Sequence, residues 1–339
     1  MGKSNYSICV VGSGAWGTAL AALLCGNGHD VTLWSYEPET VEAIRETGVN
    51  PFLKGVELPK TLKVTNDLSC VRGHKLIIMA SPSFAVRSTS RSVAQYVDPD
   101  AVIVSVAKGI EAGTGLRMSQ IVHEETGCRV AVLSGPSHAE EVSRGIPTGC
   151  VVACEDRGVA ERVQDAFMSD RFRVYSTPDV TGVELGGALK NVIALCTGII
   201  DGMGCGDNTR ALLMTRGLTE IARLGMALGS RQETFAGLTG VGDLIVTCGS
   251  MHSRNRRAGI LIGQGKTAQE AMREVGAVVE GYYAARSAKE LAEKLGVEMP
   301  ITEQAYEVLY NSKSATEALQ RLMCRQKTAE IEDAGWKQL

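Results

Sequence analysis

The sequence of 339 residues lacks the patterns of several broad classes of protein. Its ten cysteines include no C-x-x-C pair, and its five histidines do not occur at the spacing of metal ligands, so we expect no metal ion. Several of the cysteines lie within apolar stretches, where a thiol packs as a small apolar group. Because this usage is typical of reduced proteins, we expect a cytoplasmic location.

An excess of basic residues and a membrane-spanning run are also missing. The chain carries 35 lysines and arginines against 38 acidic residues, a net charge of −3, so nucleic acid is not an expected partner. No apolar run has the length expected of a membrane span, and Lys3 leads directly into the first apolar stretch without a signal peptide. We therefore expect neither secretion nor stable membrane insertion.

The chain does contain enough apolar sequence for two domains. Hydrophobic residues make up 44% and charged residues 22%, as in ordinary globular proteins of about two domains at this length. Short apolar runs alternate with helical stretches in the first half, at residues 8–11, 31–34, 76–79, 102–106, 130–133 and 149–153. This alternation predicts a mostly parallel sheet covered by helices.

The character of the sequence changes near residue 180. Helical stretches dominate from there on, at residues 183–200, 208–228, 254–263, 267–275, 282–295, 302–310 and 315–324. We therefore predict an α/β Rossmann-type domain over residues 1–182 and an all-α domain over residues 183–339. No low-complexity linker separates them, so we expect the two domains to share a cleft.

A glycine-rich turn, GSGAWG, follows the first apolar run. Gly12 permits a tight turn, Gly14 lets the backbone approach a pyrophosphate, and Gly17 allows a helix to pack closely on a strand. The N-terminus of the helix predicted after the turn would present N–H groups to phosphate. Glycines that serve only the packing of a β-α-β unit are the alternative. Because the pattern lies between a predicted strand and a predicted helix, we favour a bound dinucleotide.

The end of the second predicted strand does not specify which dinucleotide binds. An Asp or Glu that binds the ribose hydroxyls of NAD commonly lies there. This chain has Ser35 and Tyr36 at that place, Glu37 slightly later, and no arginine beside them for a 2′-phosphate. The expected cofactor is therefore NAD or NADP.

Polar residues interrupt the first predicted helix of the second domain. Lys190 and Asn191 follow Gly186 and Gly187 within an apolar stretch. Because a buried lysine is costly, Lys190 lies either on a solvated stripe or in a cleft beside a nicotinamide. In the cleft, burial and neighbouring cations would lower its pKa, and it could take a proton from an alcohol and return it to an alkoxide.

Other polar residues are candidates to act with this lysine. Asp243 is either a helix N-cap or a carboxylate that orients Lys190. Ligands of open α/β sheets bind outside the carboxyl ends of the strands, where the sequence places Lys108, Gly135, Ser137 and Ala139. An exposed loop position is the alternative for Lys108.

A cluster of polar residues begins a later predicted helix. Ser253 is a suitable N-cap, and Arg254 and Asn255 fall in the first turn. Because cations at a helix N-terminus oppose the helix dipole, a bound phosphate explains the cluster better than packing alone. A solvated basic patch is the alternative.

These segments together resemble the NAD(P)-dependent sn-glycerol-3-phosphate dehydrogenases. The matching segments cover nearly the whole chain, and they are GSGAWGTALA, AKGIE, SGPSHAEEV, GVELGGALKNVIA, GLTGVGDLIVTC, SRNRRAG, VVEGYYAAR and MPITEQAYEVLY. The resemblance implies a Rossmann-type domain followed by a helical domain of the 6-phosphogluconate dehydrogenase type. It also implies a homodimer and the reversible reduction of dihydroxyacetone phosphate to sn-glycerol 3-phosphate, a precursor of phospholipid synthesis in bacterial members.

The resemblance further implies a role for each matching residue. Lys190 is the catalytic residue, which accepts the proton in alcohol oxidation. The residues implied to contact substrate are Lys108, Gly135, Ser137, Lys190, Asp243, Ser253, Arg254 and Asn255, of which Arg254 and Asn255 hold the phosphate. The residues implied to contact the cofactor are Gly12, Ser13, Gly14, Ala15, Trp16, Gly17, Tyr36, Lys108, Ala139, Arg254, Val278 and Glu280.

Two other functions stay open from the sequence. A related two-domain hydroxy-acid dehydrogenase would use Arg254 to bind a carboxylate in place of a phosphate. A non-catalytic NAD(H)-sensing module would need the glycine turn, but it gives no reason for Lys190, Asp243 and Arg254 together.

Overall fold

One sheet of eight strands forms the first half of the computed structural model, which describes residues 5–330. The order is β3-β2-β1-β4-β5-β6-β7-β8, and neighbouring strands run parallel except β6 and β7. The bounds are β1 (Ser7–Val11), β2 (Asp30–Trp34), β3 (Lys63–Thr65), β4 (Leu76–Met79), β5 (Val102–Ser105), β6 (Arg129–Ser134), β7 (Thr148–Ala153) and β8 (Phe172–Thr177). The direction of the strand order reverses between β1 and β4, which is where Rossmann-type sheets bind dinucleotides. The prediction of a mostly parallel sheet is confirmed.

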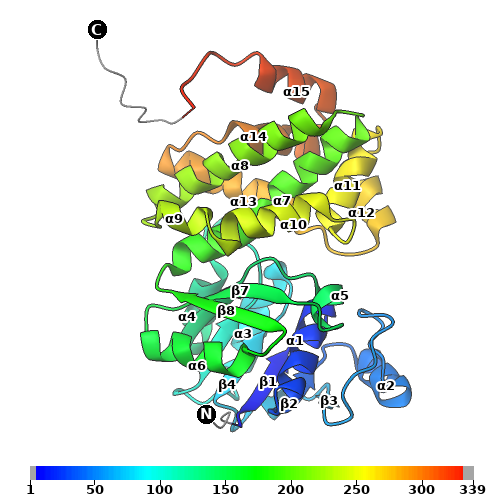
Figure 1. Ribbon diagram of the computed structural model, residues 1–339, viewed down its shortest axis with the longest axis vertical. Coiled ribbons are helices and arrows are strands. Elements are labelled where there is room, and N and C mark those ends of the chain that lie inside the picture. The colour runs from blue at the N-terminus through cyan, green and yellow to red at the C-terminus, as the bar shows by residue number, and fades with distance from the viewer. Residues whose placement is uncertain (1–4, 331–339) are drawn as a thin grey trace.

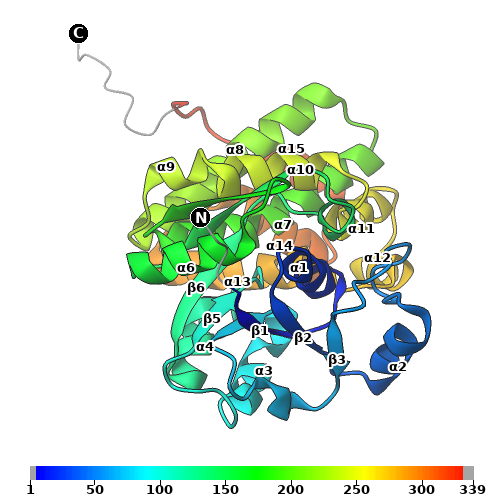
Figure 2. The ribbon, with the colours of Figure 1, turned by 60° about the horizontal axis from the view of Figure 1, so that its bottom comes forward.

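Helices cover both faces of this sheet. Ile8 and Val10 of β1 pack in one core with α1 (Ala15–Gly26), α2 (Pro38–Thr47) and α6 (Arg157–Phe167). Cys9 and Val11 pack in another core with α3 (Val86–Val93) and α4 (Met118–Thr126). Figure 2 shows β1 and β2 between α1 on one side and α3 on the other. Because both faces are buried, the central strands are mostly apolar.

The second half of the described chain contains helices and no strand (Figure 1). Its main helices are α7 (Val180–Gly202), α8 (Asp207–Ala227), α10 (Asp243–Gly249), α11 (Arg254–Gly263), α12 (Ala268–Val275), α13 (Glu280–Leu295), α14 (Pro300–Tyr310) and α15 (Ala315–Met323). α7 lies among the others, and glycines bring α11 very close to it. A Cβ on Gly198 would lie 2.1 Å from the Arg256 carbonyl oxygen, so the two backbones touch there.

The expectation that no apolar run could cross a bilayer was wrong, because one helix has the length and apolar composition that a membrane span requires. In the described residues, α7 is one helix of 23 residues with a mean hydropathy of 1.5 over an 18-residue window, and that window is wholly buried. The physical reason for its apolar character is that other helices surround it, so it has no face toward water.

Several elements differ from the predictions. The strands β3 and β8 and the helices α3 and α6 were not predicted. The residues just before α4 form a small hairpin in which Ile110 pairs with Arg117. The last strand ends at Thr177 and α7 begins at Val180, whereas the exact division after residue 182 stays a prediction.

Candidate functional site

The glycine turn joins the carboxyl end of β1 to α1. A Cβ on Gly12 would lie 2.8 Å from the backbone of Ala80, and one on Gly17 would lie 2.0 Å from the Gly12 carbonyl oxygen. Gly12 also has φ of +119°, which disfavours other residues. A Cβ on Gly14, in contrast, would meet nothing within 4 Å. The turn is therefore packed tightly at its ends and open at Gly14.

The first turn of α1 is left without a side-chain cap. Its N-cap is Gly14, no side chain accepts from its backbone, and no acidic residue lies in its first turn. The N–H groups at a helix start need acceptors, and the positive end of the helix dipole favours an anion. This arrangement fits the pyrophosphate of a dinucleotide.

Other predicted cofactor residues surround this turn. Ala15 and Trp16 pack with Ala139, the first residue of the short helix α5 (Ala139–Val142). The Ser13 hydroxyl is buried and lies 2.6 Å from that of Ser35, so this side chain already has a partner. Tyr36 is 79% exposed beyond the end of β2. The structure brings all of these residues to one edge of the sheet.

A cluster of charged side chains lies between the two halves of the chain. Asp243, which is 1% exposed, pairs with Lys190 through one carboxylate oxygen and with Lys108 through the other, at 2.7 Å for Lys108. Lys190 also donates to the Thr247 hydroxyl at 2.7 Å, and Lys108 donates to the Gly135 carbonyl at 3.1 Å. Lys190 is therefore buried, and the solvated-stripe alternative is wrong.

The surroundings of Lys190 lower its pKa to near neutral pH. Burial lowers its pKa to about 7, because the ammonium loses its water; the attraction of Asp243 opposes this change and the repulsion of Lys108 adds to it. A group with this pKa can both hold and release a proton under physiological conditions.

Two glycines of α7 place these side chains. A Cβ on Gly186 would lie 2.5 Å from the Thr239 carbonyl oxygen, so α7 touches the backbone just before α10. A Cβ on Gly187 would lie 2.6 Å from the Ser134 hydroxyl and 3.5 Å from the Lys108 side chain. The two glycines thus allow a close approach of α7, which brings Lys190 and Lys108 to the same carboxylate.

Ser253 caps α11, as the sequence predicts. Its hydroxyl accepts from the Arg256 backbone N–H at 3.2 Å. The Arg256 guanidinium is held by Asp201 at 2.8 Å, whereas Arg254 is exposed at the helix start. Of these two arginines, Arg254 is the one turned toward solvent and open to a ligand.

Asn255 ties the start of α11 to the helices beside it. Its amide donates to the Asn191 side chain at 2.9 Å and accepts from the Gly281 N–H at 2.8 Å. Asn191 follows Lys190 directly on α7, so the predicted phosphate residues lie next to the charged cluster.

Glu280 links the start of α13 to the loop after β4. Its carboxylate accepts from the Ser83 hydroxyl at 2.5 Å and from the Ser83 N–H at 3.2 Å. Burial raises the pKa of Glu280, while the Ser83 hydrogen bonds and the charge of Arg254 oppose that rise. Val278 lies beside Tyr283 in a shallow hollow just before α13. Of the two predicted late cofactor residues, Glu280 thus lies near Arg254 and the loop after β4, whereas Val278 lies beside α12 and α13.

Some residues of the site were not among the sequence candidates. Thr247 was missed although it lies four residues after Asp243, the spacing that puts both on one helix face. Ser137 is present at its predicted place, and its hydroxyl donates to the Gly135 carbonyl at 2.9 Å. Ser83 carried no sequence signal, because its contact with Glu280 joins residues 197 positions apart.

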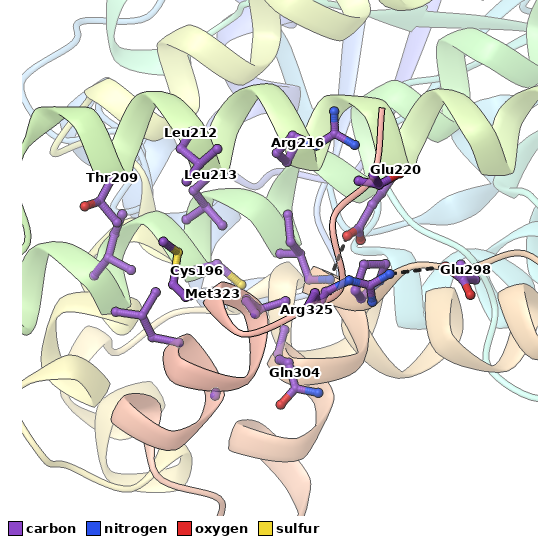
Figure 3. A pocket seen from close by; sticks show the side chains of 18 of the residues that line it. Cys196, Thr209, Leu212, Leu213, Arg216, Glu220, Glu298, Gln304, Met323 and Arg325 are labelled. Carbon is purple, nitrogen blue, oxygen red and sulfur yellow. Dashed lines mark hydrogen bonds and ion pairs between the residues drawn. The ribbon is translucent and has the colours of Figure 1, made fainter. Parts of the chain in front are cut away.

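A large apolar cavity lies away from this cluster. It has a volume of about 790 Å³ and lies between α7, α8, α14 and α15, where Leu212, Leu213 and Met323 contribute apolar side chains (Figure 3). None of the predicted site residues lines it. Among residues 5–330, no three His, Cys, Asp or Glu side chains are grouped so as to hold a metal ion.

Comparison with known proteins identifies close relatives. Models of the N-terminal and C-terminal parts of NAD-dependent glycerol-3-phosphate dehydrogenase match residues 7–160 and 179–320. The NAD(P)+ glycerol-3-phosphate dehydrogenase of Moorella thermoacetica is 55% identical over 332 residues, which cover 97% of this chain and 99% of the relative. That of Fusobacterium nucleatum is 52% identical, with 96% and 98% covered.

A solved structure supports the same relationship. The crystal structure of glycerol-3-phosphate dehydrogenase from Coxiella burnetii has a TM-score of 0.91 and 39% identity to this chain. The match covers 95% of this chain and 99% of that one, so both halves and their arrangement are shared.

Proposed function

The chain belongs to the NAD-dependent glycerol-3-phosphate dehydrogenase family and is an oxidoreductase that uses NAD or NADP, and on this premise we propose how its residues act. The reaction is the reversible reduction of dihydroxyacetone phosphate to sn-glycerol 3-phosphate. The observation that carries the proposal is the buried Lys190, which shares Asp243 with Lys108 at the junction of the two halves.

The dinucleotide binds at the start of α1. The backbone from Gly12 to Gly17 holds the pyrophosphate, and Gly14 leaves the space that this needs. The other residues that contact the dinucleotide are Ser13, Ala15, Trp16, Tyr36, Lys108, Ala139, Arg254, Val278 and Glu280. When bound, the reduced cofactor supplies the hydride that the ketone carbon accepts.

Lys190 moves the proton of the reaction. In the reducing direction its ammonium donates a proton to the carbonyl oxygen, and in the oxidising direction its amine removes the proton from the alcohol. Asp243 and Thr247 orient the amine, and the charge of Lys108 stabilises negative charge that develops on the substrate oxygen.

The substrate phosphate binds at the start of α11. The exposed Arg254 supplies a guanidinium that can form two hydrogen bonds to phosphate oxygens, and Ser253 and Asn255 shape the helix start beside it. Gly135 and Ser137 contact the other end of the substrate near Lys108. The rival hydroxy-acid substrate would place a carboxylate near Arg254 instead.

The test is an assay of reduced-nicotinamide absorbance with dihydroxyacetone phosphate and, separately, an unphosphorylated 2-oxo acid. Each substrate is offered with NADH and with NADPH. Oxidation of the reduced coenzyme with dihydroxyacetone phosphate but not with the 2-oxo acid supports the proposal. The rates with NADH and with NADPH then give the coenzyme preference. Oxidation with the 2-oxo acid alone would establish the rival dehydrogenase, and no oxidation by protein that binds a dinucleotide would favour the sensing module.

For the assembly and location, we propose a cytoplasmic homodimer that binds neither nucleic acid nor a membrane. The support is the family relationship, the balanced charge and the complete burial of the apolar window of α7. Light scattering of the purified protein tests the dimer, and fractionation of cells tests the location. A monomer would contradict the proposed dimer, and a membrane-bound fraction would contradict the proposed location.

A further inference from the structure

The loop that carries Lys108 continues into a short hairpin, residues 110–117. Ile110 pairs with Arg117, and the Glu111 N–H donates to the Leu116 carbonyl at 2.9 Å. Ile110 is buried in the core of the helical half, although it belongs to the segment after β5. The hairpin therefore packs against both halves, since Leu116 packs on a core of the first half.

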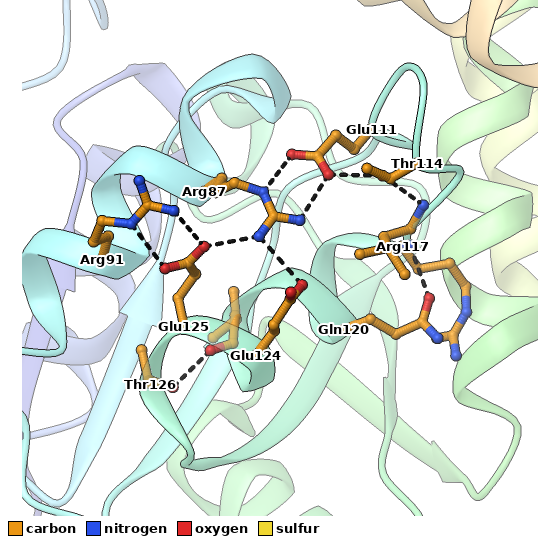
Figure 4. A network of polar contacts seen from close by, with 11 residues as sticks. Arg87, Arg91, Glu111, Thr114, Arg117, Gln120, Glu124, Glu125 and Thr126 are labelled. Carbon is orange, nitrogen blue, oxygen red and sulfur yellow. Dashed lines mark hydrogen bonds and ion pairs between the residues drawn. The ribbon is translucent and has the colours of Figure 1, made fainter.

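The first half holds one side of this hairpin. Arg87 of α3 forms two hydrogen bonds of 2.7 Å to the Glu111 carboxylate, and it also binds Glu125 of α4 at 2.7 Å (Figure 4). Because the planar Arg87 guanidinium binds both carboxylates, it fixes the distance and the relative orientation of Glu111 and Glu125. Glu111 lies three residues after Lys108, so this contact limits the positions that Lys108 can take.

The second half holds the other side through Glu184 of α7. This carboxylate is 5% exposed, pairs with Arg117, and accepts from the Ser119 N–H at 2.8 Å and the Ser119 hydroxyl at 2.6 Å. The hairpin tip has one more contact, from the Gly113 N–H to Glu290 of α13 at 3.0 Å. Of these acceptors, Glu184 is the one on the helix that carries Lys190.

A single stretch of α7 therefore contacts the hairpin, Lys108 and Asp243 in turn. Glu184 binds the hairpin; three residues later Gly187 lies against the Lys108 side chain; three residues later again Lys190 meets Asp243. This stretch is about 9 Å long, less than two turns of a stiff helix. A shift at Glu184 would therefore change the spacing between the two lysines.

We propose that the buried Glu184–Arg117 pair is a positioning device, which seats α7 on the 110–117 hairpin so that Lys108 and Lys190 share Asp243. This inference rests on the proposed function, and it assigns Glu184 no contact with substrate. The charged and titratable groups that face Lys190 are Asp243 and Cys248 on α10, Lys108 beyond β5, His138 before α5 and Cys150 on β7. Because the charge of Lys108 lowers the pKa of Lys190, moving Lys108 away raises that pKa.

The test uses Glu184→Gln, which removes the charge and keeps the shape. We expect kcat for dihydroxyacetone phosphate to fall by roughly ten- to a hundredfold, as for a small misplacement of reacting groups, with an unchanged KM for the dinucleotide. The pH at which kcat is half-maximal should move upward. Glu124→Gln is the matched control, because Glu124 joins the same network through Arg87 but is exposed and does not touch α7.

A second readout does not depend on turnover. The pKa of Lys190 in the unliganded protein can be followed by pH-dependent labelling with an amine-reactive reagent and mass spectrometry. We expect it to be higher in Glu184→Gln than in the parent protein and unchanged in Glu124→Gln. If the parent protein fails to reduce dihydroxyacetone phosphate, the proposed function fails, and this titration still decides the inference.

Three results would overturn the inference. These are an unchanged kcat and pH midpoint in Glu184→Gln, an equal loss in the control, or a lower kcat without any change in the Lys190 titration. If Glu184→Gln does not fold, Arg117→Gln takes its place, since Arg117 is partly exposed and its loss leaves the Ser119 hydrogen bonds to Glu184 intact. The same outcomes then apply.

Discussion

α1 and α11 both begin beside the proposed ligands, but their first turns are satisfied in different ways. α1 starts at an uncapped Gly14 and offers backbone N–H groups alone. α11 starts at Ser253, whose hydroxyl already accepts a backbone N–H, and it offers the side chain of Arg254. The uncapped start of α1 suits a pyrophosphate that lies directly on the backbone. The start of α11 suits the phosphate group of a small substrate, which the Arg254 side chain can bind. We therefore propose that the start of α1 binds the pyrophosphate through backbone N–H groups, whereas the start of α11 binds the substrate phosphate through the Arg254 side chain.

The strongest test of this division is Lys190→Ala. We expect kcat to fall by about 10²–10⁴-fold, because the proton of the reaction loses its carrier, while dinucleotide binding to the sheet half stays near normal. Steady-state kinetics and a fluorescence titration with NADH measure the two effects separately. Near-normal turnover would show that another group moves the proton.

A smaller effect is expected at the start of α11. Arg254→Ala should raise the KM for dihydroxyacetone phosphate by about 10- to 100-fold, since one charged hydrogen-bonding group is lost. Arg257→Ala is the control, because it removes another exposed arginine from the same turn. Equal effects of the two substitutions on KM would indicate a diffuse basic patch and not a phosphate site.

The pH dependence should reveal Lys190 in both directions of the reaction. Its pKa of about 7 means that the ammonium dominates below that pH and the amine above it. Reduction needs the ammonium, so its kcat should fall about tenfold per pH unit above the pKa, and oxidation should fall in the same way below it. If kcat rose with pH in both directions of the reaction, or fell with pH in both, this assignment would be contradicted.

The smallest changes compare two glycines of the first half. Gly17→Ala should lower the free energy of unfolding by about 1–3 kcal/mol, because its Cβ would overlap the Gly12 carbonyl oxygen. Gly14→Ala should leave stability unchanged, since its Cβ meets nothing, and should weaken dinucleotide binding. Thermal unfolding with and without NADH separates these outcomes. A loss of stability in Gly14→Ala would mean that the open space has a structural role.

Elements with a strong local pattern were predictable. The runs at residues 76–79 and 254–263 coincide with β4 and α11, because each has a clear period of its own. β3 was missed because it has three residues and no fully buried one. β8 was missed although its buried and exposed residues alternate over Phe172 to Tyr175, a pattern that predicts a half-buried edge strand.

The sequence by itself determined the glycine turn, the two-part architecture and the family, since these depend on neighbouring residues and on the order of motifs. Only the tertiary structure decided that Asp243 bridges two lysines, that burial lowers the pKa of Lys190, and that Glu184 and Arg117 hold the hairpin. The physical reason is that a pKa and an ion pair depend on which charges become neighbours and how much water remains between them. Those neighbours come from segments 53 to 135 residues apart, and the packing of α7 brings them together.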